Sequence, residues 1–100
     1  RAATASLHAQ VATAHARFAA AAFALSTLES KTLPAARAAF QAAKDSFENG
    51  KSDYLDTLDA ERLLLEVERQ SIDARSTYHN TLATLEGLTG SPLTGTNKQP

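Results

Sequence analysis

The chain has 100 residues, of which 43% are hydrophobic, and it contains no Cys, Met or Trp. A formal net charge of −1 gives no electrostatic case for nucleic-acid binding, and the lack of cysteine excludes a disulfide framework, a thiolate metal site and a cysteine nucleophile. Eighteen of the first 43 residues are alanine, the strongest helix former but one that buries little surface. The composition therefore predicts long, thin, paired helices rather than a thick core.

Charge is divided unevenly between the two halves of the chain. Residues 1–50 carry five bases and three acids, and residues 51–100 carry five bases and eight acids. The first segment has a net charge of +2 and the second a net charge of −3, which modestly favours their antiparallel pairing. No apolar run approaches the roughly 20 residues of a membrane-spanning helix. The chain begins at Arg1 without a signal peptide, so a processed chain or an expression fragment is expected.

The first predicted element is a helix over residues 3–31. Its apolar residues are spaced alternately by four and three, which is the heptad pattern of a coiled-coil seam. The seam consists of Leu7, Val11, Ala14, Phe18, Ala21, Leu25 and Leu28.

A break or kink is expected near residues 31–34, where Pro34 removes an amide donor and disfavours helix in the residue before it. Proline is tolerated in the first turn of a new helix, with Thr32 or Leu33 near its cap. The apolar spacing restarts with its register shifted by one, which predicts a second helix over residues 34–48. The seam of this helix comprises Leu33, Ala36, Phe40, Ala43 and Phe47.

The strongest turn signal of the chain is Asn49-Gly50, since both residues accept the left-handed conformation that ends helices. Ser52 and Asp53 follow as candidate N-caps of a third helix over residues 53–86. Gly87 and Gly90, and then the proline at position 92, are expected to end it, leaving 91–100 as a flexible tail. The expected seam of the third helix includes Leu55, Leu58, Leu65, Ile72, Tyr78, Leu82 and Leu85.

Together these elements predict an all-α fold, a long antiparallel helical hairpin over residues 1–90. The arms are 3–31 plus 34–48 and 53–86, and the tip is 49–52. A helix of 34 residues spans roughly 50 Å, and so short a turn leaves antiparallel neighbours as the simple solution.

Nothing in the sequence indicates an enzyme, a cofactor or a metal centre. His8 and His15 are seven residues apart, roughly 10 Å along a helix, which is too far for one ion. A composite site with His79 is a minor alternative to solvated or interface histidines. No nucleophile–base arrangement and no glycine-rich phosphate loop stands out.

Asp56 and Asp59 lie three residues apart, on one face of the third helix near the tip. Two interpretations stay open: surface acids that favour the positive end of the helix dipole, and paired carboxylates with a function. The charged stripe continues through Arg62, Glu66, Arg69 and Asp73. Such a stripe indicates a face toward water, either bulk water or the water of a channel.

The segment from Phe47 to Leu65, FENGKSDYLDTLDAERLLL, resembles the C-terminal repeat of TolC-like outer-membrane efflux channels. The ending from Tyr78 to Gly90, YHNTLATLEGLTG, looks like that of the cobalt–zinc–cadmium branch, as does Leu33-Pro34-Ala35-Ala36. The resemblance covers about residues 33–90. The positions that fit the central motif are Phe47, Gly50, Tyr54, Leu55, Asp56, Leu58, Asp59, Ala60, Arg62 and Leu64.

This resemblance implies that the chain is the helical hairpin of the second repeat of a trimeric channel. Such channels join a barrel in the outer membrane to a helical tunnel through the periplasm of a Gram-negative bacterium, and this chain contains no candidate barrel strands. The tip residues Asn49, Gly50, Lys51 and Ser52 would face the periplasmic adaptor, and Asp56 and Asp59 would ring the tunnel entrance. Some relatives carry a basic gate residue where this chain has Ser52, which argues against an ionic latch there.

Two functional hypotheses follow. The first is the exit duct of a tripartite pump, with adaptor and inner-membrane pump as partners and heavy-metal cations as cargo. The second is a generic helical-hairpin interaction module, such as an adaptor's own hairpin. The motif from Gly50 to Leu65 favours the first.

Overall fold

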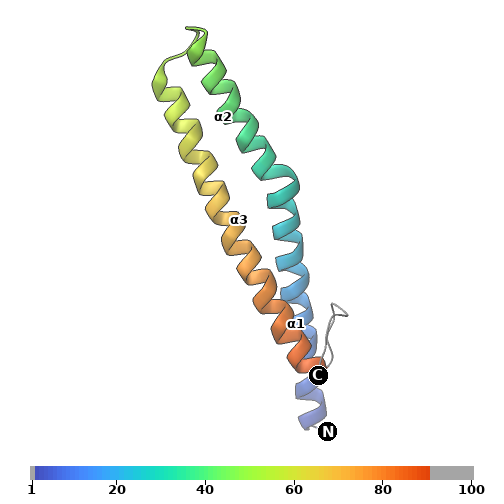
Figure 1. Cartoon of the computed structure of the whole chain (residues 1–100). Helices are drawn as coiled ribbons and strands as arrows, with labels where there is room; N and C mark the ends of the chain where they lie inside the picture. Colours follow the sequence, from blue (N-terminus) through green and yellow to red (C-terminus); the bar gives the residue numbers. More distant parts are fainter. Residues whose placement is uncertain (1, 91–100) are drawn as a thin grey trace, which may run out of the picture.

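The computed structural model describes residues 2–90 of the chain. Helix α1 (Ala2–Thr27), the π-helical turn η1 (Leu28–Thr32) and helix α2 (Leu33–Glu48) follow one another directly and form the first arm. Helix α3 (Tyr54–Thr89) returns beside them as the second arm (Figure 1). The molecule is 70 Å long, and no strand occurs among the described residues. The predicted all-α antiparallel hairpin is thus confirmed.

The expected discontinuity before Pro34 is present as the π-helical turn η1. The Leu33 amide donates to the Leu28 carbonyl, five residues back, where an α-helix would bond four back. Leu28 and Leu33 are also the two seam residues whose five-residue spacing breaks the heptad. The wider turn absorbs one extra residue, so both seams face α3.

The first arm nevertheless stays helical through this turn, and the expected new cap at Thr32 or Leu33 is wrong. Both residues have right-handed helical dihedral angles, and Thr32 makes no capping hydrogen bond. Pro34 has no amide hydrogen, and its ring crowds the carbonyl four residues back. Widening the preceding turn relieves that crowding without ending the helix.

The predicted seam of the first arm packs against α3 along its middle. Ala14, Ala21, Leu25 and Ala36 are buried. Most remaining seam residues are half-buried: Val11, Phe18, Leu28, Leu33, Phe40 and Ala43. Only Leu7 and Phe47, at the two ends, are exposed.

The predicted seam of α3 is wrong in its N-terminal half. Leu55, Leu65 and Ile72 are 57%, 57% and 69% exposed, whereas Tyr78, Leu82 and Leu85 do face the first arm. The arm-facing positions alternate by three and four and include small and polar residues: Thr57, Ala60, Leu64, Val67, Ser71, Ala74 and Tyr78. The seam predicted from the sequence was made of the larger apolar side chains. In the structure, the residues that face the first arm are those with the regular spacing of three and four.

A hydrogen bond between the arms fixes their relative height near the tip. The buried Thr57 hydroxyl donates to the Ala43 carbonyl over 3.3 Å. Thr57→Val keeps the shape and helix propensity but removes the donor, so we expect a loss of about 1 kcal/mol in the free energy of unfolding. Thermal denaturation followed by circular dichroism measures this loss. The exposed Thr77→Val is the control, and an equal loss in both variants would contradict the role assigned to this bond.

Helix α3 ends later than the sequence predicted. Gly87 lies inside the helix, and the end comes at Gly90, which is left-handed (φ 76°) and donates its amide to the Glu86 carbonyl over 2.8 Å. A glycine interior to a helix costs about 1 kcal/mol relative to alanine but does not by itself stop the helix. The predicted flexible tail, 91–100, lies outside the described residues.

The sequence analysis expected no apolar segment long enough to span a membrane, and the first arm corrects this expectation. By length and composition alone, the helical stretch Thr4–Glu48 could cross a membrane, with a window of mean hydropathy 1.2. Only 11% of that window is buried in the hairpin. Its apolar character comes largely from alanine, and residues 18–28 carry no charge. The first arm therefore leaves most of this apolar surface uncovered.

Candidate functional site: the hairpin tip and its aspartates

The tip is built by backbone hydrogen bonds that end α2 within two residues. The Gly50 amide donates to the Phe47 carbonyl over 3.0 Å, and the Lys51 amide to the Ser46 carbonyl over 2.8 Å. This pair of bonds is the Schellman motif, in which the first of the two donor residues is left-handed. Gly50 fills that position with φ 73°.

The four predicted tip residues lie together in this turn but differ in exposure. Asn49, Gly50 and Lys51 are exposed, whereas Ser52 is half-buried. The Ser52 hydroxyl oxygen is buried and has no hydrogen-bond partner among the described residues. The end of the hairpin therefore presents a protruding surface formed by the Asn49 amide, Gly50 and the Lys51 cation.

An aromatic pair joins the two arms just below the tip. The rings of Phe47 on α2 and Tyr54 on α3 are 5.3 Å apart and tilted by 53°. Both side chains are also partly open to solvent, at 41% and 54%. Both aromatics belong to the motif quoted from the sequence, but their contact became evident only once the arms were paired.

Helix α3 begins with Asp53 as its N-cap, which is one of the two candidates that the sequence offered, Ser52 being the other. The Asp53 carboxylate accepts a hydrogen bond from the Asp56 amide over 3.2 Å. Asp56 and Asp59 are exposed on the first two turns of α3. Among the described contacts, neither of their carboxylates has a hydrogen bond or an ion pair. Since the capping is done by Asp53, these two charges are available for another role.

The charged stripe along α3 is partly neutralised within the helix. Arg69 forms ion pairs with Glu66 at 2.7 Å and with Asp73 at 2.8 Å, and all three side chains are about half exposed or more. The hydrogen bond from Arg69, followed by that from Gln70, lowers the pKa of the Glu66 carboxyl. The interaction therefore persists at neutral pH and is lost as the pH falls through that lowered pKa. Exposed pairs of this kind contribute little to stability.

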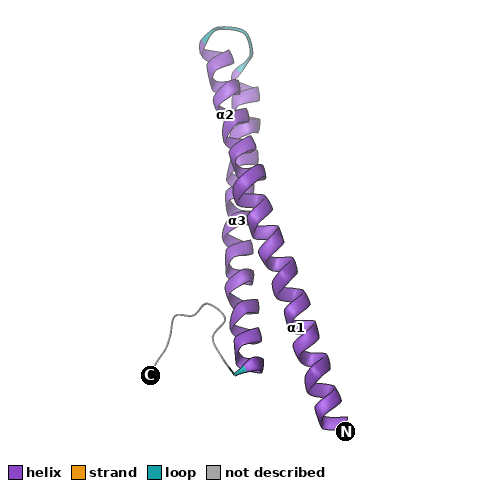
Figure 2. Cartoon of the chain, turned by 90° about the vertical axis from the view of Figure 1, so that its right-hand side faces the viewer, coloured by secondary structure: helices purple, strands orange, loops and turns teal. Residues whose placement is uncertain are grey.

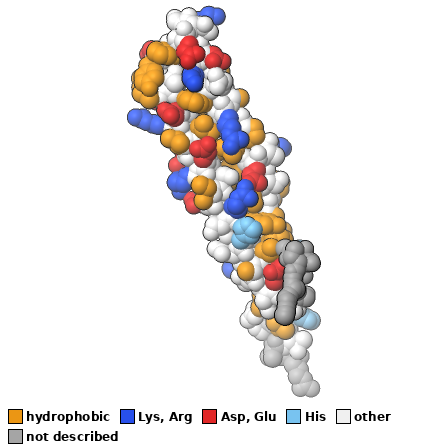
Figure 3. All heavy atoms as spheres, viewed as in Figure 1, with side chains coloured by type: hydrophobic (Ala, Val, Ile, Leu, Met, Phe, Trp, Pro, Cys, Tyr) orange, Lys and Arg blue, Asp and Glu red, His pale blue; other side chains and the backbone are white. Residues whose placement is uncertain are grey.

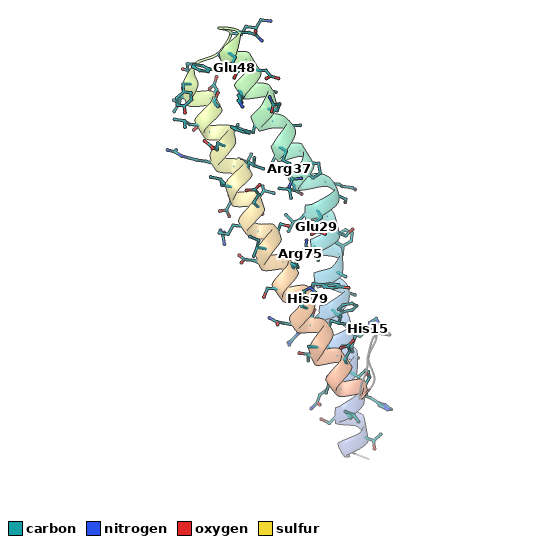
Figure 4. The ribbon with its side chains drawn as sticks, viewed as in Figure 1. His15, Glu29, Arg37, Glu48, Arg75 and His79 are labelled. Atoms are coloured by element: carbon teal, nitrogen blue, oxygen red, sulfur yellow. The ribbon has the colours of Figure 1, made fainter. Side chains whose placement is uncertain are left out.

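A further ion pair, between Glu29 of η1 and Arg75 of α3, crosses the hairpin (Figure 4). The sequence reasoning missed it, because the arm-to-arm height of these two residues depends on the extra residue in η1. The rings of Phe18 and Tyr78, 5.3 Å apart, bridge the arms next to it. These contacts hold the middle of the hairpin closed.

Toward the chain ends the arms separate (Figure 2). An open groove of about 500 Å³ lies between them, lined on α1 by Gln10, Thr13 and Arg17 and on α3 by Asn80, Thr84 and Leu88. Ala9 and Ala14 line the groove as well, so its surface is more apolar than polar although it is open to solvent.

The histidines do not assemble into a metal centre. Among the described residues, no group of three or more His, Asp or Glu side chains could hold a metal ion. His8 and His15 are exposed on α1, and His79 packs edge-on against Tyr78 with ring centres 5.4 Å apart.

Comparison with known proteins gives one family and one relative. A family model described as outer membrane efflux protein matches residues 1–91. The cobalt-zinc-cadmium resistance protein CzcC of Cupriavidus metallidurans is 36% identical over 64 residues, which cover 64% of this chain and 15% of CzcC. The chain thus spans only a small part of the length of this relative. No solved structure matches the chain.

Proposed function

Because the chain belongs to the outer membrane efflux protein family, we propose that this hairpin is a wall segment of the periplasmic tunnel of an efflux channel. Outer membrane efflux proteins are transport channels rather than enzymes, and their place is the envelope of Gram-negative bacteria. The observation that carries the proposal is that the family match runs along the whole described hairpin, a bare pair of arms 70 Å long. An adaptor hairpin, the alternative, has no such match in its favour.

In this proposal the channel is a homotrimer, and the tip of each hairpin points away from the outer membrane. The exposed surface of Asn49, Gly50 and Lys51, with Ser52 behind it, docks onto a periplasmic adaptor, which connects the channel to an inner-membrane pump. A tip suits this role because it protrudes and is held by backbone bonds, so its shape depends little on side-chain packing.

We assign Asp56 and Asp59 to the inner entrance of the tunnel. Three copies of two carboxylates place six negative charges around one aperture, which raises the local concentration of cations and disfavours anions. The similarity to a cobalt-zinc-cadmium resistance protein supports divalent metal cations as the cargo. A ring of unpaired carboxylates attracts such ions without holding them, which suits a duct that must release what it carries.

The experiment replaces both aspartates by asparagine in the full-length channel and measures ion selectivity in planar bilayers. We expect the cation preference to fall clearly, because the ring charge is removed while polarity is kept. The melting temperature should change little, since Asp53 caps the helix. Asp45→Asn, an exposed acid on α2 near the same end, is the control. Unchanged selectivity together with a lower melting temperature would leave these aspartates a structural role only.

A further inference from the structure

The exposed turn at the tip contains an asparagine followed by a glycine, a pair with a chemistry of its own. Asparagine is a thermolabile residue, because the backbone nitrogen of the next residue can attack its side-chain amide carbon. A side chain on that next residue hinders the attack, and glycine has none. Asn49 and Gly50 are both exposed, and no atom lies within 4 Å of the place where a Gly50 Cβ would stand. Nothing around the tip therefore blocks such a reaction sterically.

The closed turn holds this reaction back in two ways. The Gly50 amide donates its hydrogen to the Phe47 carbonyl over 3.0 Å, and the nitrogen attacks only after it has lost that hydrogen. The new ring also closes only when the Gly50 nitrogen is rotated to the Cβ side of Asn49. Asn49 has ψ 7°, which places the Gly50 nitrogen beside the Asn49 nitrogen instead. The turn must therefore open before Asn49 can react.

Opening of the tip requires little of the hairpin to move. Asn49, Gly50 and Lys51 are exposed, and backbone hydrogen bonds close the turn that they form. Just below it, the arms are joined by the rings of Phe47 and Tyr54, which are 41% and 54% exposed. Segments with few buried apolar contacts open far more often than the whole molecule unfolds. A local opening that leaves both arms paired is thus sufficient to free Asn49.

We propose that Asn49 is a site of spontaneous isoaspartate formation, controlled by the opening of the tip. In the open turn, the Gly50 nitrogen forms a bond to the Asn49 side-chain carbonyl carbon. The bond from that carbon to the amide nitrogen breaks, and this nitrogen leaves as ammonia, which carries the hydrogen that Gly50 gave up. Water then opens the cyclic imide at either of its carbonyls and yields aspartate or isoaspartate. Water is the only other reactant, and nothing is oxidised or reduced.

Isoaspartate changes the tip in both shape and charge. The main chain then runs through the former side chain, which lengthens the turn by one carbon atom, and a carboxylate replaces a neutral amide beside Lys51. The two bonds of the Schellman motif, from Gly50 to Phe47 and from Lys51 to Ser46, do not fit this longer path. Figure 3 shows charged side chains gathered on the half of the hairpin nearest the tip, and the new charge adds to them.

This inference rests on the proposed function only in its consequence. If the tip docks onto an adaptor, the docked partner keeps the turn closed and protects Asn49, whereas an unoccupied tip is slowly converted and lost for docking. The reaction itself needs no partner. Conversion of Asn49 and docking of the tip can therefore fail separately in experiment.

Peptide mapping of the complete chain by mass spectrometry tests the reaction. The folded chain and the chain unfolded in guanidinium chloride are incubated in mildly alkaline buffer, and isoaspartate and aspartate at position 49 are measured against unmodified Asn49. We expect conversion in both samples, roughly 30-fold more slowly in the folded chain, because two backbone hydrogen bonds must break first. Asn80, which is exposed within α3 and followed by Thr81, is the internal control and should stay unmodified in the folded chain.

A matched pair of variants tests whether the opening is local. Tyr54→Leu and Tyr78→Leu each remove one ring pair with centres 5.3 Å apart, the first near the tip and the second in the middle of the hairpin. Tyr54→Leu should raise the conversion rate of Asn49 roughly fivefold, as expected for the loss of an aromatic contact, and Tyr78→Leu should leave that rate unchanged. Equal acceleration in both variants would mean that global unfolding exposes Asn49. That result, equal rates in the folded and unfolded chains, or an Asn49 as stable as Asn80 in the folded chain would each overturn the inference.

Discussion

Replacing Gly50 by valine is expected to abolish productive docking of the channel while leaving the hairpin folded. Gly50 has φ 73°, and a left-handed conformation costs a residue with a side chain about 1–2 kcal/mol, and more if it is β-branched. No atom lies within 4 Å of a Cβ added there, so the cost is backbone strain and not a clash. The turn would relieve that strain by changing the positions of Asn49 and Lys51, which belong to the proposed docking surface.

The hairpin supplies a matched control for this variant at its opposite end. Gly90 has φ 76° and equally open surroundings, so Gly90→Val carries the same strain far from the tip. In cells that depend on the full-length channel for growth at raised concentrations of zinc, one of the proposed cargo ions, we expect Gly50→Val to lose growth and Gly90→Val to keep it. Gly50→Asn should recover most of the growth, because asparagine tolerates the left-handed conformation. Normal growth of the Gly50→Val strain would contradict the proposal that the tip is the docking site.

The second large effect is expected from single-residue deletions in the first arm. Deleting Ala38 from α2 rotates one part of the arm by about 100° relative to the other, so that one part of the seam turns away from α3. We expect a loss of roughly 3 kcal/mol or more, because several buried side chains are exposed together. For a domain of this size, that loss lowers the melting temperature by on the order of 15 °C.

Deleting Ser30 from η1 should have the opposite outcome when both deletions are made in a Pro34→Ala chain, in which an α-helical turn meets no proline ring. The deletion brings Leu28 and Leu33 from a spacing of five to a spacing of four, which joins both seams into one heptad and converts the π-turn into α-helix. The hydrogen bond from the exposed Ser30 hydroxyl to the Ser26 carbonyl is lost, at a cost of about 1 kcal/mol or less. Circular dichroism melts of both deletion variants measure the difference. If the two deletions destabilise the hairpin equally, the π-turn does not compensate for the register.

The tip was the part of the molecule most open to prediction. Asn49-Gly50 and Asp53 act through hydrogen bonds and dihedral angles within a few residues of themselves, so their roles are written locally in the sequence. The grouping of the four tip residues and the exposure of Asp56 and Asp59 follow from the same local rules. The contact of Phe47 with Tyr54 needed both arms in place.

By itself, the sequence determined the all-α hairpin, the seam of the first arm, the position of the turn and the one-residue register shift before Pro34, since each depends on local periodicity, propensity or turn chemistry. Tertiary structure decided the rest. Whether the one-residue register shift was accommodated by a loop or by a π-turn depended on α3. A π-turn keeps both seams of the first arm packed against that helix. Which stripe of α3 faces inward depended on the alanine-rich first arm. Thr57 and Ser71 are buried against that arm, and Thr57 also bonds to it, while Leu65 and Ile72 stay outside. Periodicity identifies an apolar stripe, but only the shape of the opposite surface determines which stripe is buried.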